Sequence, residues 1–243
     1  MCKNCEKKDD YNASIVIHNG VFHADDVCAA ALVAIECSTE DYDISVIRSR
    51  NPKYWKQADL VLDVSGQYDG VKYFDHHQND VPVYENGIKM AACGLYLKHM
   101  TSLTEQEKQY LLDHGLYAVQ AQDNGQDLKE MGLEHLSNPF TFISTYNCDW
   151  KIGVYGIDQD EAFEDAADVT YRVIKNLIHA ACMEREAHVL TRIVYLMMFR
   201  GESNAFIQDK TDFPYTRIKE MRKNFREHRA DIIKEYGLDD GGN

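Results

Sequence analysis

The stretch 14–26, "SIVIHNGVFHADD", joins a β-branched run, a turn signal and the start of a helical pattern. "SIVIH" (14–18) has the composition of a β-strand. The Asn19-Gly20 pair that follows favours a turn, because it tolerates a positive φ angle. A helical pattern then runs from Asp25 to about Cys37. This order of strand, turn and helix predicts the first part of an α/β fold.

Three further runs have strand composition, and they alternate with helical stretches. The runs are "ISVIRSR" (44–50), "LVLDV" (60–64) and "VKYF" (71–74). Residues 88–100 and 104–123 are predicted helices, and Thr104 and Glu107 are placed to form a capping box at the start of the second. The alternation predicts an α/β fold with a mostly parallel sheet flanked by helices.

Helical patterns continue after the region of the predicted sheet. Core-type residues recur every three or four positions through about 160–185, at Phe163, Ala167, Thr170, Ile174, Leu177 and Ala181. A further helical stretch reaches about residue 199, and "FRGESNAF" (199–206) then interrupts the pattern before a short strand-like piece and a basic terminal helix. We expect disordered ends at 1–12 and 239–243, an α/β domain with long C-terminal helices at 13–200, and a second unit at 201–243.

The composition is that of a soluble globular protein, with 44% hydrophobic and 27% charged residues. The longest apolar run, "IVYLMMF" (193–199), is much shorter than a membrane span, so we expect no membrane association. We read no secretory signal at the N-terminus, and the seven cysteines follow no disulfide spacing. An intracellular, cytoplasmic location is therefore expected. Cys2-x-x-Cys5 is either half of a zinc site or part of a flexible, reduced tail.

The net charge of −14 argues against broad, sequence-independent clamping of nucleic acid. The charge is uneven, because residues 214–234 carry seven Lys and Arg against three Asp and Glu. That segment has a local charge of +4, which leaves −18 on the rest of the chain. An acidic protein can still bind phosphate if divalent metal ions supply the positive charge.

Polar side chains gather at the ends of the predicted strands. They are His18, Arg48, Arg50, Asp63, Asp75, His76 and His77, and a later predicted helix ends at Asp123. In an open parallel sheet, sites form outside the carboxyl ends of the strands, so these residues are expected to meet in one crevice.

The residue types in this set are those of a metal site. The window "HNGVFHADD" (18–26) adds His23, Asp25 and Asp26, and imidazole with carboxylate suits manganese, iron or zinc. Asp63 lies in an apolar strand, where a carboxylate requires a partner or a metal. Taken singly, His18 also fits a surface histidine, Asp25 or Asp26 a helix N-cap, and His76-His77 a solvated turn. Together these signals favour a metal site.

These motifs resemble the DHH phosphoesterase superfamily, which includes RecJ-type exonucleases and manganese-dependent pyrophosphatases. A closer resemblance is to the melanocyte-proliferating-gene family of metal-dependent exonucleases, carried by "IHNGVFHADD", "VIRSRNP", "LVLDVSGQYD", "YFDHHQ" and "QDNG". It covers roughly residues 14–150, and "STYNCDW" (144–150) is similar to that family's Asn-x-x-Trp segment.

The resemblance implies two divalent metal ions, with manganese as the first choice. The implied ligands are His18, His23, Asp25, Asp63, His76 and Asp123, with Asp63 bridging the two ions. His77 would face the substrate phosphate, and Asp75 would orient its neighbours. Arg48, Arg50 and Lys89 are candidates to neutralise the remaining phosphate charge.

The leading functional prediction is a metal-dependent phosphodiesterase, a nuclease or exonuclease on RNA, DNA or short oligonucleotides, in which two metals activate a water. "KMAACG" (89–94) lacks the hydroxyls of the family's corresponding stretch, and residues 201–243 look like a remnant of its second domain. These departures leave two alternatives open: a small-molecule phosphoesterase or pyrophosphatase, and a non-catalytic metal-binding scaffold. A homodimer is a candidate assembly.

Overall fold

The computed structural model describes residues 13–37, 44–147 and 159–238 of the chain. It divides into two compact units, Met1–His179 and Ala180–Asn243. The predicted disordered ends, the Cys2 and Cys5 pair, and Trp150 of the Asn-x-x-Trp segment lie outside the described residues. The predicted domain boundary near residue 200 stays a prediction.

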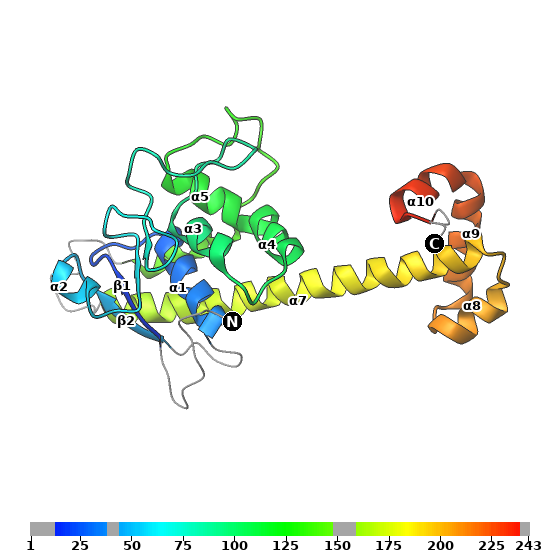
Figure 1. Ribbon diagram of the computed structural model, residues 1–243, viewed down its shortest axis with the longest axis horizontal. Helices are drawn as coiled ribbons and strands as arrows, with labels where there is room; N and C mark the ends of the chain where they lie inside the picture. The colour runs from blue at the N-terminus through cyan, green and yellow to red at the C-terminus, as the bar shows by residue number, and fades with distance from the viewer. Residues whose placement is uncertain (1–12, 38–43, 148–158, 239–243) are drawn as a thin grey trace. The chain divides into compact units, whose positions relative to one another are not determined.

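The first unit is built on a four-stranded sheet in the order β2-β1-β3-β4, with all neighbours parallel. The strands are β1 (Ala13–Ile17), β2 (Ile44–Arg48), β3 (Leu60–Leu62) and β4 (Tyr73–Phe74). Ile15 of β1 pairs with Val46 on one side and Leu60 on the other. The α/β fold with a parallel sheet is confirmed. The two middle strands are β1 and β3, and Figure 1 shows β1 beside β2.

Helices cover the sheet and form most of the core of this unit. They are α1 (Ala24–Cys37), α2 (Pro52–Trp55), α3 (Ala92–His99), α4 (Glu105–Leu111), the π-helical turn η1 (Leu112–Leu116), α5 (Tyr117–Asp123) and the 3₁₀ segment η2 (Pro139–Tyr146). Ten residues of α1 are buried, including both acidic residues of its first turn, Asp25 and Asp26. Two carboxylates are therefore buried at the start of α1, next to the edge of the sheet.

The predicted helix at 104–123 is correct at its start and interrupted in the middle. The capping box between Thr104 and Glu107 is present. Gly115 then takes φ +152°, and a Cβ at this position would come within 2.7 Å of Pro139 and 2.8 Å of Phe140. A glycine is required here because η2 packs directly against the backbone. The kink sets the direction of α5, which ends at Asp123.

The helix α7 (Gln159–Phe199) is one continuous element of 41 residues, where the sequence indicated two stretches. Phe163, Ala167 and Ile174 are buried in the core of the first unit. Val194 and Met198 are buried in the core of the second unit. The predicted core spacing is therefore confirmed, and α7 supplies both cores.

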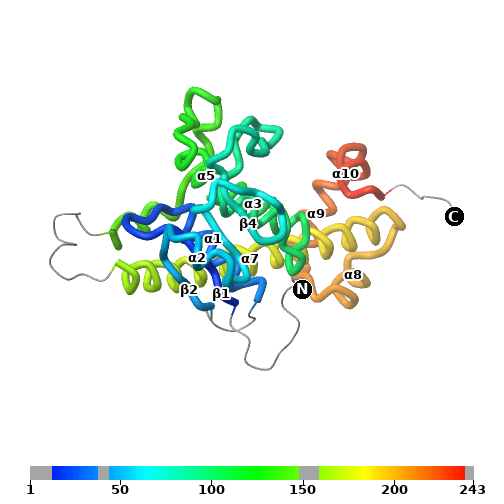
Figure 2. Tube along the Cα trace, turned by 60° about the vertical axis from the view of Figure 1, so that its left-hand side comes forward, coloured from blue at the N-terminus to red at the C-terminus, as the bar shows by residue number. Residues whose placement is uncertain are grey.

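The second unit is helical, and the predicted strand-like piece after residue 206 is wrong. Residues there form α8 (Asn204–Thr211), followed by α9 (Tyr215–Glu227) and α10 (Arg229–Tyr236), drawn orange to red in Figure 2. The Ser203 hydroxyl accepts a hydrogen bond from the Phe206 amide, and this cap starts the helix. The left-handed Asp212 and the following Pro214 separate α8 from α9. The predicted basic terminal helix is thus a pair of helices.

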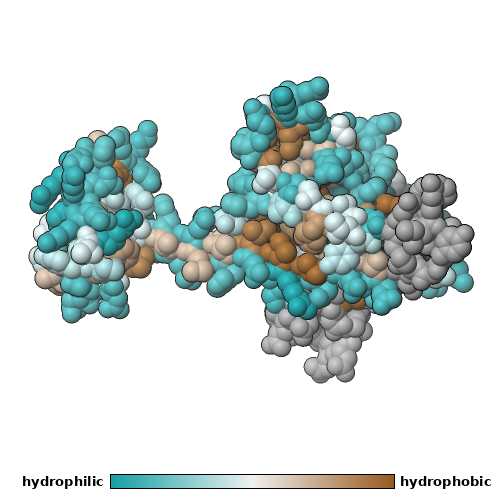
Figure 3. Space-filling model, turned by 180° about the vertical axis from the view of Figure 1, so that it is seen from behind, coloured by the Kyte–Doolittle hydropathy of each residue, from teal (hydrophilic) through white to brown (hydrophobic). Residues whose placement is uncertain are grey.

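In the described parts of the chain, no helix combines the length and apolar character required to cross a membrane. Met183, Val189 and Ile193 of α7 are exposed. Figure 3 shows hydrophobic and hydrophilic side chains mixed along this helix. The homodimer and the cytoplasmic location stay predictions.

Candidate metal centre and adjoining pockets

The loop between β1 and α1 is held in place by three side chains from two other segments. Gly20 takes φ +91°, which turns the chain back after β1. Asn147, at the end of η2, accepts a hydrogen bond from the Phe22 amide (3.0 Å) and donates one to the Phe22 carbonyl (2.7 Å). Arg48 donates to the Gly20 carbonyl, and Arg50 to the Asn19 side chain at 2.8 Å. The loop therefore presents His18 and His23 from a fixed backbone.

A first triad of metal-type side chains consists of His18, Asp26 and Asp63. His18 Nε2 lies 2.9 Å from Asp26 Oδ2 and 3.6 Å from Asp63 Oδ2, and all three residues are buried. The other oxygen of Asp26 accepts hydrogen bonds from the amides of His23 (2.8 Å) and Val27 (3.0 Å). Asp26 thus caps α1 with one oxygen and faces His18 with the other.

A second triad consists of Asp25, His76 and Asp123. His76 Nε2 lies 2.9 Å from Asp123 Oδ2. Asp25 is fully buried, and its two oxygens accept the amides of Ala92 (2.8 Å) and Cys93 (2.9 Å) at the start of α3. The carboxylate is therefore fixed by the positive end of a helix, and the triad draws on α1, the loop after β4 and the end of α5.

Asp63 connects the two triads. Its Oδ2 faces His18, and its Oδ1 lies 3.2 Å from His76 Nε2. The residue directly follows β3 and takes φ +49°, a left-handed conformation that aspartate adopts more readily than most residues. Asp63 also forms a third group with His76 and His77. The predicted ligands from four separate segments therefore meet at the carboxyl ends of the strands.

Buried atoms in these triads support a fit to divalent cations. Asp26 Oδ2, Asp63 Oδ1 and His76 Nε2 are buried and make no hydrogen bond of acceptable geometry, despite their close contacts. Unpaired buried polar atoms cost free energy, and a cation would satisfy them. Within each triad the candidate ligand atoms lie within 4.8 Å of one another, and imidazole with carboxylate suits first-row ions. The donor set fits a divalent metal.

The electrostatics of the centre show an excess of buried negative charge. Burial lowers the pKa of His76, but Asp123 and Asp63 outweigh it and raise the pKa to about 11. Burial also lowers the pKa of His18, and the contact with Asp26 more than compensates, so the pKa is raised. Burial, Asp123 and Asp63 together raise the pKa of Asp25 well above its ordinary value. Without a cation, protons supply the positive charge at this centre.

The two adjacent histidines lie in different environments. His76 is buried among the carboxylates, whereas the His77 side chain is 63% exposed. His77 Nδ1 lies 2.7 Å from Asp75 Oδ1, which also accepts the His77 amide at 2.9 Å. Burial raises the pKa of Asp75, but hydrogen bonds from the Gly66 amide and from His77 leave it below its usual value. An ionised Asp75 thus orients His77 at the rim of the centre.

Three predicted residues are not members of the two triads. His23 is 60% exposed, and its Nδ1 lies 3.6 Å from Asp123 Oδ1. Arg48 has a side chain only 1% exposed, and its guanidinium packs against the rings of both Phe22 and Phe163. Lys89 lies outside the described lining of the pocket at the metal centre. The substrate contacts assigned to Arg48 and Lys89 stay predictions, while the geometry gives Arg48 a part in positioning the loop.

One residue of the triads was not among the predicted ligands. Asp26 belonged to the His/Asp-rich window, but Asp25 was the residue carried over from the family. The signal for both is their position in the first turn of α1, where neighbouring side chains point in different directions.

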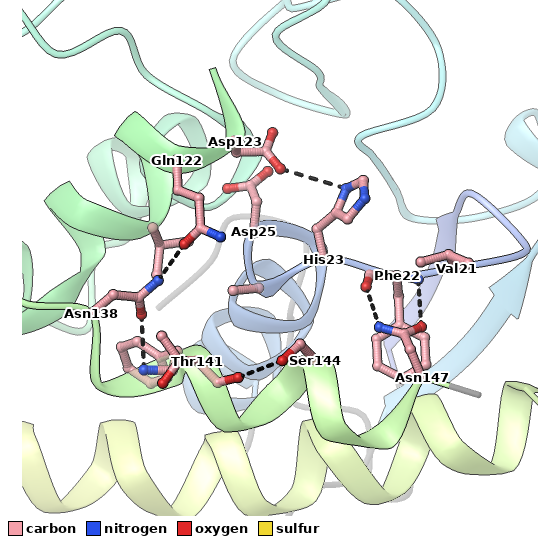
Figure 4. A pocket seen from close by; sticks show the side chains of 13 residues that line it. Val21, Phe22, His23, Asp25, Gln122, Asp123, Asn138, Thr141, Ser144 and Asn147 are labelled. Carbon is pink, nitrogen blue, oxygen red and sulfur yellow. Dashed lines mark hydrogen bonds and ion pairs between the residues drawn. The ribbon is translucent and has the colours of Figure 1, made fainter. Parts of the chain in front are cut away.

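Two pockets open at the centre, and they share Val21, His23 and Asp123. The metal pocket, of about 670 Å³, is lined by His18, Asn19, Gly20, Val21, His23, Arg50, Asp63, Val64, Gly66, Asp75, His77 and Asp123. The amide pocket, of about 500 Å³, is lined by Val21, Phe22, His23, Ala24, Asp25, Val119, Gln122, Asp123, Asn138, Phe140, Thr141, Ser144 and Asn147 (Figure 4). Arg50 and His77 are thus placed on the wall of the metal pocket.

Residues 14–208 match the MYG1 exonuclease family, described as "Uncharacterised protein family (UPF0160)". This chain belongs to the MYG1 exonuclease family. The match includes every residue of both triads.

Relatives in the MYG1 family come from fungi, bacteria and mammals. The MYG1 protein of Schizosaccharomyces pombe is 38% identical over 251 residues, covering 93% of this chain and 72% of that protein. The MYG1 protein of Saccharomyces cerevisiae is 38% identical over 100 residues, covering 40% and 29%. A human protein named MYG1 exonuclease is 40% identical over 62 residues, covering 25% and 16%. No solved structure matches the chain.

Proposed function

We propose that this chain is a divalent-metal-dependent phosphodiesterase, a nuclease or exonuclease that acts on RNA, DNA or short oligonucleotides. The observation that carries the proposal is the pair of triads, His18–Asp26–Asp63 and Asp25–His76–Asp123, joined through Asp63. Six different side chains are sufficient for two ions, and imidazole with carboxylate suits manganese, iron or zinc. Manganese is our first choice because the resemblance to manganese-dependent phosphoesterases implies it. The printed name of the human relative, MYG1 exonuclease, supports the same class of reaction.

Two bound metal ions would lower the pKa of a water molecule and neutralise charge on the phosphoryl group, so that no side-chain nucleophile is required. The chain's own residues hold and orient the reactants. Asp63 keeps one oxygen toward each triad, and buried Asp25 and Asp26 supply charge from a rigid helix start. These groups are fixed before substrate arrives, which lowers the cost of reaching the transition state.

His77 and Arg50 are placed to contact the phosphate. Both line the metal pocket, and Arg50 is the one lysine or arginine among its described lining residues. Asp75 holds His77 Nδ1, which leaves the other ring nitrogen for an oxygen of the substrate. Arg50 donates one hydrogen bond to the Asn19 side chain, and the remaining N–H groups of its guanidinium are available for a phosphate oxygen. A pocket with one guanidinium relies on metal ions for the rest of the charge compensation.

The test combines elemental analysis with a hydrolysis panel on the purified chain. The panel contains oligonucleotides of several lengths, pyrophosphate and bis(p-nitrophenyl) phosphate, each assayed with manganese. We expect turnover of oligonucleotides, and a loss of about 100-fold or more in Asp63→Asn and His76→Ala. Asp80→Asn and His135→Ala are matched controls, because both residues are exposed and lie outside the triads.

The same panel separates the rival functions. Hydrolysis of pyrophosphate in preference to every oligonucleotide would instead support a small-molecule phosphoesterase. Metal-loaded protein that hydrolyses nothing would support a binding scaffold. Undiminished manganese-dependent hydrolysis in Asp63→Asn and His76→Ala would contradict the assignment of the site.

A further inference from the structure

The amide pocket differs in chemistry from the metal pocket beside it. Neutral polar side chains line it, namely Gln122, Asn138, Thr141 and Ser144, over apolar groups that include Val119 and Phe140. Figure 4 shows Gln122, Asn138, Thr141 and Ser144 along the left and lower edge of the hollow, with Asp123, Asp25 and His23 along its upper edge. The pocket thus has a neutral wall and a wall shared with the metal centre.

The charges around the amide pocket disfavour a second phosphate. No lysine or arginine occurs among its described lining residues, while Asp25 and Asp123 are both carboxylates. An anionic group would meet no compensating cation from the chain on the neutral wall. A neutral group with hydrogen-bonding edges would meet amides and hydroxyls instead.

The hydrogen bonds of the pocket fix which atoms are available. Both polar atoms of Asn138 are hydrogen-bonded, because its Oδ1 accepts the Phe140 amide (2.9 Å) and its Nδ2 donates to Gln122 Oε1 (3.0 Å). That second bond orients the Gln122 amide, and Figure 4 shows its nitrogen turned toward the hollow. The hydroxyl of Ser144 donates to the Thr141 carbonyl (2.8 Å). The pocket is therefore an ordered polar surface and offers a donor from Gln122.

We propose that the amide pocket binds the nucleoside part of the nucleotide whose phosphate lies at the metal centre. The inference rests on the proposed function and adds a substrate feature to it. Val21, His23 and Asp123 line both pockets, so a group in the amide pocket lies directly beside a phosphate in the metal pocket. A base and sugar are neutral and rich in donors and acceptors, which matches the neutral wall, and the volume of about 500 Å³ is in the range of ligand pockets.

The proposal separates a nucleotide substrate from a simple phosphate substrate. Pyrophosphate would occupy the metal pocket and leave the amide pocket to water. A nucleotide would fill both pockets, and its base and sugar would add contacts that phosphate alone lacks. A nucleotide should therefore bind more tightly than phosphate, and a binding experiment can measure this difference without any hydrolysis.

The experiment is calorimetric titration of the full chain, loaded with manganese, with adenosine 5′-monophosphate and with inorganic phosphate. We expect the monophosphate to bind the unsubstituted chain about tenfold or more tightly than phosphate. Thr141→Trp places a large side chain in the pocket and should remove this preference. Thr145→Trp is the matched control, because Thr145 is exposed on the same η2 segment and does not line the pocket. It should keep the preference.

A second variant covers the case in which Thr141→Trp disturbs folding. Gln122→Ala removes the oriented amide from an exposed position and should reduce the preference several-fold. Equal affinities for the monophosphate and phosphate in the unsubstituted chain would overturn the proposal, whatever the hydrolysis panel shows. A preference for the monophosphate without hydrolysis of any substrate would leave the pocket assigned and remove the proposed function. Hydrolysis of oligonucleotides without a preference for the monophosphate would keep the proposed function and remove the assignment of the amide pocket.

Discussion

The carboxylate of Asp63 lies between two histidines, with Oδ2 at 3.6 Å from His18 Nε2 and Oδ1 at 3.2 Å from His76 Nε2. His18 follows β1 and His76 follows β4, while Asp63 follows β3, which runs between those strands in the sheet. The order of the strands therefore places the shared carboxylate in the middle. One oxygen of Asp63 thus faces His18 of the first triad, and the other faces His76 of the second.

Replacing Asp63 with asparagine should reduce metal binding at both triads. The substitution keeps the shape and the left-handed backbone but removes the charge that faces both histidines. We expect the bound manganese, measured by elemental analysis, to fall from about two ions per chain to one or fewer, because carboxylate ligands bind such ions as anions. Asp80→Asn should retain the full content. Retention of both ions in Asp63→Asn would contradict the bridging role.

The adjacent histidines should respond differently to alanine. His76→Ala should lower metal occupancy, because its ring is buried among the carboxylates of Asp63 and Asp123. His77→Ala should keep the metal content and slow hydrolysis by about 10² to 10⁴-fold, the usual effect of losing a group that assists proton transfer or charge development. Metal content and turnover are measured on the same preparations. Equal metal loss in the two variants would refute this division.

Metal binding should release protons. The carboxylates raise the pKa of His76 to about 11, so the metal-free centre holds a proton there at neutral pH. A ligand nitrogen must lose that proton, and the apparent affinity for manganese should therefore rise with pH. Titrations at pH 7.5 in two buffers of different ionisation enthalpy give the proton count directly. We expect release from the unsubstituted chain and less from His76→Ala; identical counts would be inconsistent with a protonated His76.

The same raised pKa has a consequence for the metal-free fold. A histidine whose pKa is higher in the folded than in the unfolded chain stabilises the fold at low pH. For His76 the contribution is complete below its ordinary value near 6.5 and disappears as the pH rises toward about 11. Denaturant unfolding of metal-free protein between pH 6 and 10 should show this decline, and His76→Ala should show a smaller one.

Arg48 and Arg50 should affect different properties, although they are two residues apart. The buried Arg48 guanidinium donates to Gln159 O and Asp160 Oδ1, at 2.8 and 3.0 Å, as well as to the loop. Arg48→Met should lower the free energy of unfolding by about 2 kcal/mol, because three hydrogen bonds from a buried, charged donor are lost. Arg50→Met should leave stability within about 0.5 kcal/mol, as for surface changes, and raise KM for a phosphoester. Chemical denaturation and steady-state kinetics measure the two effects.

The sequence predicted the parallel sheet and the convergence of polar residues at its edge, because strand composition and the residue after each strand are local signals. It did not distinguish the role of Asp25 from that of Asp26. Which of the two carboxylates faces His18 depends on how α1 packs against α3. The sequence assigned Arg48 to substrate, because the rings of Phe22 and Phe163 against which its guanidinium packs come from distant segments.

Two further features depend on contacts that no local pattern contains. The break in the helix at 104–123 arises where Gly115 meets Pro139 and Phe140. The amide pocket draws on α5 and η2, which are brought together by that contact, by the hydrogen bond from Asn138 to Gln122 and by the core around Phe140. Neither feature could therefore be predicted from composition or residue spacing.

The conformation of Asp63 limits which amino acids its position tolerates. With φ at +49°, glycine, asparagine and aspartate are the residues that fit the backbone at little cost. Among these three, aspartate alone has an acidic side chain. Glutamate would keep the charge, yet it would pay the backbone penalty of about 1 kcal/mol and move the oxygens by one bond. In a saturation library, selection for folding should admit Gly and Asn at residue 63, whereas selection for activity should return Asp alone.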